Sequence, residues 1–174
     1  ASDVYKRQEL GRWAVAEALT REGLMRVLRP GEAFEALRAR LGLLHRVLGD
    51  PWPAMLAADL ADTAQDWLGP ELERIADGTP ATRVDAVSAL RRLLPWPQAS
   101  RLEELVPERI RVPSGAAVRL AYPAPEEHDD DPDAQPAPPV LAVKLQECFG
   151  WAEGPRVADG RVPVLLHLLL SLIH

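Results

Sequence analysis

Apolar residues recur at a helical period over the first part of the chain, from about Glu9 to Leu105. The clearest stripe advances by alternating steps of three and four residues: Phe34, Leu37, Leu41, Leu44 and Leu48. Such spacing places apolar side chains along one face of a helix. The stripe lasts only about two heptads, so it predicts core packing rather than a coiled coil. Glycine and prolines at 49–53 end this helix.

Helices are also predicted on both sides of this stripe. One helical stretch begins at Leu10 and runs toward Leu28, loosened at Gly23 and ended by Pro30. Another covers 56–68 and is expected to end at the Gly69-Pro70 pair that follows it.

Shorter helices are predicted before the helical period is lost. After a turn of helix around 72–75 and a loop at 77–80, Thr82 is expected to cap the next helix. We expect that helix to bury its apolar positions, Val84, Val87, Leu90 and Leu94. A last short helix presents apolar side chains over 102–106.

From Pro107 the apolar period changes from about 3.6 to 2, which is typical of strands. The alternation predicts strands at 109–112 and 117–122, joined as a hairpin by Pro113-Ser114-Gly115. A short strand at 140–143, a turn of helix at 145–149, a loop at 157–160 and a buried strand at 161–168 are expected to follow.

The predicted fold class is α+β. A small helical bundle over 9–106 precedes a small mixed α/β unit over 107–168, whose short β-sheet we expect to be incomplete. Residues 123–139 are rich in Pro, Asp and Glu and cannot pack a core, so we interpret them as a disordered acidic loop.

The net charge adds little to this prediction. The 174 residues carry a net charge of −6, and six acidic residues cluster in one segment: Glu126, Glu127, Asp129, Asp130, Asp131 and Asp133. Without that cluster, the remaining 20 acidic residues equal the 20 Lys and Arg residues. Charge alone therefore neither supports nor excludes an RNA-binding surface.

The compartment is expected to be the cytoplasm. Cys148 is the only cysteine, so no internal disulfide is possible and a reducing compartment fits best. The first residues contain no apolar stretch typical of a secretory signal. The longest apolar run, 162–173, is too short to span a bilayer, so no membrane partner is expected.

Both ends of the chain resemble translated sequencing-adapter sequence. We interpret 1–8 as an artefactual leader and 169–174 as an artefactual end, which would leave the reading frame cut at both ends. The alternative is a frayed helix start and a last β-strand.

Motifs for nucleotide or acyl chemistry are missing from the sequence. It contains neither G-x-x-x-x-G-K-[ST] nor G-x-G-x-x-G, and Ser114 lacks the glycines of a nucleophile elbow. The D-x-D-x-D run at 129–133 fails as a calcium loop, because Ala134 and Val140 stand where Gly and Glu are needed. We expect no catalytic residue, no metal site and no cofactor in this chain.

Histidines and tryptophans are interpreted as structural residues. The histidines show no ligand spacing, and His167 alternates with Leu166 and Leu168 as a satisfied strand histidine would. Three of the five tryptophans neighbour prolines or helix ends, where they usually plug the edge of a core; base stacking is the alternative.

Basic residues on the predicted strands are the candidate nucleic-acid-binding set: Arg109, Arg111, Arg119, Lys144, Arg156 and Arg161. Arg109 and Arg111 must face away from Ile110 and Val112, because side chains alternate along a strand. Such a row could contact a phosphate backbone, and a solvated sheet face is the alternative.

Three segments of the second half carry a family resemblance: VPSG at 112–115, VLAVKLQECFG at 140–150 and GRVPVLLHLL at 160–169. With the upstream segments LRARLGLLHRVLGDPWP and WLGPEL, they resemble the C-terminal region of HrpB-type ATP-dependent RNA helicases, a bacterial branch of the DEAH-box group. The resemblance covers roughly residues 9–168.

The resemblance implies that ATP hydrolysis belongs elsewhere. In that family two RecA-like motor domains carry the phosphate-loop lysine and the DEAH carboxylates, and no position of this chain matches them. ATP and Mg²⁺ are therefore expected in motor domains upstream, on the same parent chain, and the family is expected to continue past residue 174 into a basic, aromatic-rich tail. The run Glu127-His128-Asp129 is not the DEAH motif, since it lies in the acidic segment rather than after a strand.

The expected function is that of an accessory C-terminal region of such a helicase, which supports the motor or guides RNA to it. The alternative is a protein–protein interaction or structural module without nucleic-acid contact, which would use the helical half as its docking surface.

Overall fold

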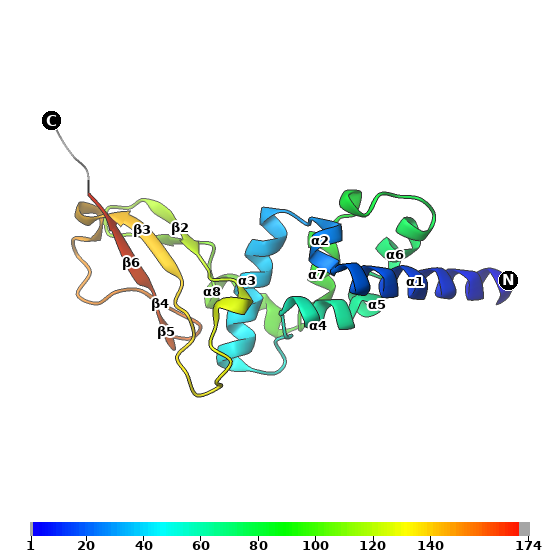
Figure 1. The fold of residues 1–174 in the computed structure, drawn as a ribbon. Helices are drawn as coiled ribbons and strands as arrows, with labels where there is room; N and C mark the ends of the chain where they lie inside the picture. Colours follow the sequence, from blue (N-terminus) through cyan, green and yellow to red (C-terminus); the bar gives the residue numbers. More distant parts are fainter. Residues whose placement is uncertain (1, 171–174) are drawn as a thin grey trace. The chain divides into compact units, whose positions relative to one another are not determined.

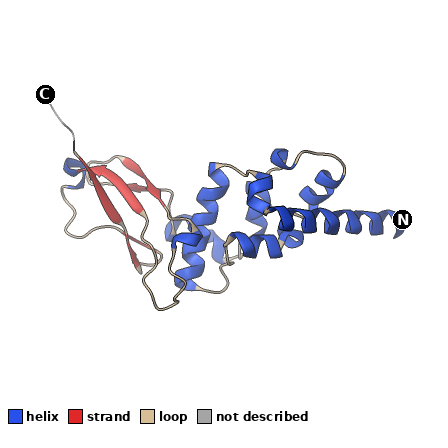
Figure 2. Ribbon diagram, in the orientation of Figure 1, coloured by secondary structure: helices blue, strands red, loops and turns tan. Residues whose placement is uncertain are grey.

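The computed structural model describes residues 2–170, and Figure 1 traces the chain through them. The chain divides into two compact units, Ala1–Arg38 with Pro53–Leu94, and Ala39–Trp52 with Pro95–His174. The first unit is helical, whereas the second combines helices with strands (Figure 2). These elements confirm the α+β fold class.

The division between the units does not coincide with the predicted boundary at residue 107. Part of the helix over 32–48 and the segment 95–106 group with the strands. One reason is a set of specific contacts: the Ala158 N–H donates to the Leu105 carbonyl (2.7 Å), and Arg40 binds the Val106 carbonyl (2.8 Å).

The predicted adapter-derived ends, 1–8 and 169–174, lie partly outside the described residues, and their origin stays a prediction. Of the described part, residues 2–8 belong to helix α1 (Ser2–Glu22). Leu169 is the last residue of strand β6 (Leu165–Leu169).

The first unit is built from α-helices and two 3-10 turns. Its elements are α1, α2 (Leu24–Leu28), the first part of α3 (Glu32–Leu48), α4 (Ala57–Asp62), α5 (Ala64–Trp67), α6 (Gly69–Ala76), η1 (Ala81–Arg83), α7 (Ala86–Leu90) and η2 (Arg91–Leu93). Helix α1 packs against α2, α4, α5 and α6. Gly11 faces α6, where a Cβ at this position would lie 3.4 Å from the Ala76 Cβ, in ordinary van der Waals contact.

The predicted break between α1 and α2 is confirmed at Gly23. This residue has φ of 91°, which glycine adopts without the strain that a side chain would add. The apolar stripe of α3 is confirmed as well, because Phe34, Leu41 and Leu44 are fully buried.

Two predicted helix boundaries are wrong. The helix expected over 56–68 is divided at Thr63 into α4 and α5. Gly69-Pro70 does not end a helix but begins α6, because a proline in the first turn lacks only an N–H that has no partner there.

The predicted cap at Thr82 is also wrong. Thr82 lies in the turn η1, and Asp85 caps α7 by accepting a hydrogen bond from the Ser88 N–H (3.1 Å). The Ser88 hydroxyl also donates to the Asp85 carboxylate (2.7 Å), and this contact, followed by the capping N–H, lowers the pKa of Asp85. Of the apolar positions expected in that helix, Leu90 and Leu94 are buried, whereas Val84 and Val87 are half-buried.

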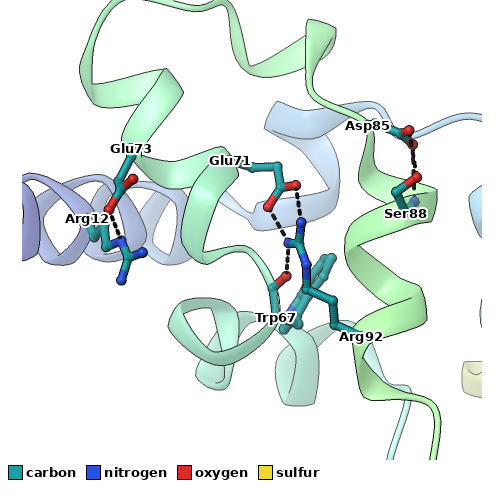
Figure 3. A network of polar contacts seen from close by, with 7 residues as sticks. All are labelled: Arg12, Trp67, Glu71, Glu73, Asp85, Ser88 and Arg92. Carbon is teal, nitrogen blue, oxygen red and sulfur yellow. Dashed lines mark hydrogen bonds and ion pairs between the residues drawn. The ribbon is translucent and has the colours of Figure 1, made fainter.

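A buried aromatic pair and an ion pair with a buried carboxylate lie in the first unit, and Figure 3 shows Trp67, Glu71 and Arg92. The Trp67 ring lies 6.0 Å from that of Phe34, and its Nε1 donates to the Leu60 carbonyl (2.9 Å). Glu71 has a side-chain exposure of 2% and accepts two hydrogen bonds from Arg92, at 2.6 and 2.9 Å. The same guanidinium donates to the Trp67 carbonyl (2.8 Å), and its contact with Glu71 raises the Arg92 pKa.

The second unit joins helices to a small mixed sheet. Its elements are the remainder of α3, η3 (Gln98–Arg101), α8 (Leu102–Leu105), β1 (Arg109–Arg111), β2 (Ala117–Ala121), η4 (Pro125–Glu127), β3 (Val140–Lys144), η5 (Leu145–Cys148), β4 (Arg156–Val157), β5 (Val162–Pro163) and β6. Four strands form one sheet in the order β1-β2-β3-β6, and β4 pairs with β5 in a separate hairpin. The β1–β2 and β2–β3 pairs are antiparallel, whereas β3 and β6 are parallel. The predicted hairpin over 109–122 and the predicted strand at 140–143 are therefore confirmed.

The buried strand predicted at 161–168 is wrong. The segment contains two short strands separated at Val164, and only β6 joins the main sheet. Leu165 and Leu168 of β6 are 55% and 44% exposed. An apolar run does not distinguish a central strand from an edge strand, and among the described residues β6 has a neighbour on one side only.

The acidic segment 123–139 makes specific contacts that its composition does not reveal. An Arg46 Nη on α3 donates to the carbonyls of Asp131 (2.5 Å) and Ala134 (2.7 Å). His128 Nδ1 accepts a hydrogen bond from the Ala137 N–H (2.9 Å). Burial lowers the pKa of His128, and the nearby Arg46 charge acts in the same direction.

None of the described helices is both long and apolar enough to cross a membrane.

Replacing Arg92 with methionine would leave Glu71 charged and buried without its partner. We expect the free energy of unfolding to fall by about 3 kcal/mol, the lower end for a broken buried pair, because Arg92 is itself 39% exposed. The control Arg91→Met changes an exposed neighbour and should alter that free energy by less than about 0.5 kcal/mol. Urea unfolding followed by circular dichroism measures the free energy of unfolding of both variants. Equal values for Arg92→Met and Arg91→Met would contradict the role of the Glu71–Arg92 pair.

Acidification should loosen the acidic segment through His128. Its folded-state pKa lies below the ordinary histidine value of 6.5, so its stabilising contribution is complete above pH 6.5 and declines as the pH falls toward the folded-state pKa. We expect the Ala137 amide to lose protection from hydrogen exchange over this range. His128→Asn keeps an acceptor near the Nδ1 position without titrating there, and should remove the pH dependence. An unchanged pH profile in that variant would contradict the assignment.

Candidate nucleic-acid interface

The register of the β1–β2 hairpin assigns its arginines to one face of the sheet. Arg109 lies directly opposite Arg119, and Arg111 lies opposite Ala117. The alternating positions Ile110 and Val118 are also paired with each other, on the opposite face. Arg109, Arg111 and Arg119 are all exposed, so the alternation predicted from the sequence is confirmed.

Lys144 joins the same face through β3. Ala121 pairs with Val140, and side chains two positions apart share a face, so Arg119, Ala121, Val140 and Lys144 lie together. Lys144 is exposed, whereas the alternate residues Leu141 and Val143 are at most 1% exposed. Burial of the inner side chains thus directs all four cations outward.

The exposed side of this sheet, called the open face below, contains eleven paired positions: Arg109, Arg111, Ala117, Arg119, Ala121, Val140, Ala142, Lys144, Leu165, His167 and Leu169. All are exposed except Val140, which is half-buried. No Asp or Glu occurs among them. The open face therefore carries four cations without a carboxylate at any of its paired positions.

The nearest carboxylate in sequence is directed away from this face. Glu108 precedes Arg109 and binds Arg40, at 3.2 Å between Arg40 Nη1 and the Glu108 carboxylate. The Arg40 side chain is 4% exposed and also binds Glu103 (2.8 Å). Since Glu108 engages Arg40, it does not neutralise the neighbouring arginine, Arg109.

Opposed arginines on neighbouring strands raise the energy of the sheet, because like charges directly across a strand pair repel each other. Arg109 and Arg119 form such a pair. An anion bound between them would relieve the repulsion. Arg111 is oriented separately, since its Nη1 donates to the Gly115 carbonyl (2.7 Å) in the hairpin turn.

Two residues of the predicted set lie elsewhere. Arg156 belongs to the hairpin β4–β5, where its Nε donates to the Gly160 carbonyl (2.6 Å). Arg161 lies in the turn of the same hairpin and is exposed. The structure therefore brings four of the six predicted basic residues together on one sheet and leaves these two outside it.

His167 belongs to the open face, although the sequence suggested a satisfied strand histidine. It is exposed and lies opposite Ala142, in the register that also aligns Val140 with Leu165 and Lys144 with Leu169. Among the described residues, its ring has no hydrogen-bond partner. Alternation alone could have placed it beside the lysine, but only the pairing of β6 with β3 shows which face is exposed.

The tryptophans divide between buried and exposed positions. Trp52 and Trp67 are buried, which supports their structural interpretation. Trp13 and Trp96 are 54% and 67% exposed, so they do not plug a core. In the part of the chain that the structure describes, no group of three or more His, Cys, Asp or Glu residues is arranged to hold a metal ion.

Comparisons with known proteins agree on one family. The family described as ATP-dependent helicase C-terminal (HrpB_C) matches residues 67–171. The ATP-dependent RNA helicase HrpB of Escherichia coli (strain K12) is 35% identical over 136 residues, which are 78% of this chain and 16% of that protein.

Solved structures give the same result. One crystal structure of Escherichia coli HrpB, described as a DExH-box NTPase, matches 88% of this chain and 18% of its own with a TM-score of 0.71 and 33% identity. A second, described as a DEAH/RHA helicase, matches 90% of this chain and 19% of its own with a TM-score of 0.72 and 33% identity. The chain thus spans less than a fifth of the length of these relatives, and the matches confirm the resemblance inferred from the sequence.

Proposed function

The chain belongs to the ATP-dependent helicase C-terminal family (HrpB_C), and from this premise we propose that it is an accessory region that supports or guides RNA for the motor of a longer parent chain. The observation that carries the proposal is the open face, where Arg109, Arg111, Arg119 and Lys144 are exposed together without a carboxylate at the paired positions.

Phosphate is the ligand chemistry that suits this face. Neighbouring strands lie about 4.8 Å apart, so cations on β1, β2 and the end of β3 present a row of closely spaced positive charges. A nucleic-acid backbone carries evenly spaced negative charges, and contacts to it position a protein without reading sequence. We therefore propose that this region holds the RNA strand and does not read its base sequence.

Binding of ATP and Mg²⁺ is proposed for other domains of the parent chain. The Escherichia coli relative is an ATP-dependent RNA helicase, and we propose that this chain likewise serves motor domains of its own parent chain, which would bind ATP and Mg²⁺. The cytoplasm is the proposed compartment, because a single cysteine favours a reducing environment.

Docking of another protein on the helical unit is the second candidate function. Leu10 and Trp13 of α1 are 67% and 54% exposed, although both are apolar. Surface hollows flank Trp13, one shared with Leu10 and Gln65, the other with Thr20 and Ala61. An exposed tryptophan beside such hollows is a feature of protein-binding surfaces.

RNA binding should depend on the open face and on salt. With a labelled oligouridylate, the double variant R109Q/R119Q should bind more weakly than the unmodified chain. Its plot of log affinity against log salt should be shallower by about 1.4, because two phosphate contacts on a single strand are lost. Fluorescence anisotropy at low and moderate salt measures both quantities.

The matched control for this comparison is R83Q/R91Q, which removes two exposed arginines of the helical unit. This control should retain the affinity and salt slope of the unmodified chain. Equal losses in the two double variants would contradict a specific phosphate site, and RNA binding lost only on Trp13→Ala would favour the helical unit.

The purified chain should show no RNA-stimulated ATP hydrolysis, because the phosphate-loop motif needed to hold the nucleotide is missing from its sequence. A coupled assay of phosphate release, with and without oligouridylate, checks this expectation. Turnover above background that survives further purification would contradict the assignment of the chemistry to motor domains.

A further inference from the structure

We propose that His167 stacks on an unpaired nucleobase, so that the open face holds single-stranded RNA by its phosphates and one of its bases together. This inference rests on the proposed function, since it assigns the substrate class of the same face. Two features of the open face support it: the position of His167 relative to the arginines, and the division of the face into a charged and an apolar part.

The strand register aligns His167 with the arginine pair. His167 lies opposite Ala142 on β3, and Ala142 shares its face with Lys144 and with Arg119 of the next strand. Continuing the β2–β3 register by two positions places Arg119 opposite Ala142. Arg109, Arg119, Ala142 and His167 therefore form one row across the four strands of the sheet.

Ala142 leaves room for a ligand within this row. Its methyl group is the smallest side chain that an L-residue can present between the long arginine and the imidazole ring. The strands of Arg119 and His167 are two spacings apart, roughly 10 Å, and the flexible arginine side chain can shorten that separation. A nucleotide has its phosphate and base at opposite ends of the sugar, so one nucleotide can contact both side chains.

Along the same row, the open face changes from charged side chains on β1 and β2 to mainly apolar side chains on β6. Arg109, Arg111 and Arg119 occupy β1 and β2, whereas β6 presents His167 between Leu165 and Leu169. Leu165 and Leu169 are 55% and 44% exposed. Phosphates favour the first side, and the flat apolar surface of a base favours the second.

The His167 ring is available for stacking. It is exposed, and among the described residues no hydrogen bond engages either of its nitrogens. Histidine is one of the aromatic side chains on which unstacked RNA bases are held. Inside a duplex, neighbouring base pairs cover both faces of each base, so only an unpaired base can offer a face to this ring.

A partner protein could instead cover the apolar strip of Leu165, His167 and Leu169. The charge of the adjacent arginines favours a polyanionic ligand over an apolar protein surface. The two ligands also differ in a measurable way, because only RNA binding combines sensitivity to salt with sensitivity to the aromatic ring at position 167.

The test compares His167→Ala and His167→Phe in the full chain, with three probes: oligouridylate, its duplex with oligoadenylate, and inorganic polyphosphate. We expect His167→Ala to lower the affinity for oligouridylate by roughly five- to tenfold, as removal of one stacked base contact would. His167→Phe should restore binding, because it keeps an aromatic face. The affinity for polyphosphate, which has no bases, should change little in either variant, and the duplex should bind more weakly than the single strand.

The outcomes separate this inference from the proposed function. If His167→Ala binds oligouridylate as the unmodified chain does while R109Q/R119Q does not, the stacking role is overturned and the phosphate-binding face stands. Equal losses for oligouridylate and polyphosphate would also overturn stacking, since they would indicate a purely electrostatic contribution. If the unmodified chain binds neither RNA probe at low salt, both the inference and the proposed function fail.

Discussion

The alternation of side chains across the sheet β1-β2-β3-β6 is the constraint on which the proposed surface depends. Leu120, Leu141 and Val143 are buried, and their burial fixes which side of β2 and of β3 faces the core. A slip of one residue in β2 or β3 would turn its cation inward and its apolar residues outward, at a large energetic cost. The core therefore determines the exposure of Arg109 and Arg119 as firmly as it determines the packing of the leucines.

Both units contain ion pairs, with which the cations of the open face can be compared. In the helical unit, Glu71 and Arg92 satisfy each other almost completely, and Arg12 pairs with Glu73 at 2.7 Å. In the second unit, Arg40 engages Glu103 and Glu108, and Arg101 engages Glu104 and Asp159. Several arginines are thus paired within the chain, whereas no ion pair is found for Arg109, Arg119 or Lys144 of the open face among the described residues.

Local signals in the sequence were sufficient for the elements whose own residues determine their structure. The stripe from Phe34 to Leu44 and the hairpin around Pro113-Ser114-Gly115 have the expected helix and turn. The resemblance to HrpB-type helicases, inferred from short motifs, is confirmed by the family match. One prediction failed on a local choice, since Asp85 rather than Thr82 caps α7 through Ser88, three residues away. Another failed where distant contacts decide, because β6, in the segment predicted as one buried strand, is exposed at the edge of the sheet. His167 was misjudged for the same reason, since exposure of a strand face depends on its neighbours.

We propose that the four cations of the open face contact RNA while the basic residues outside it do not. The most direct test is an NMR titration of the chain with oligouridylate that observes the arginine Nε–H groups one by one. The signals of Arg109 and Arg119 should shift on RNA addition, while those of Arg156 and Arg161 should stay in place. Shifts confined to Arg156 and Arg161, or to arginines of the helical unit, would contradict the proposal.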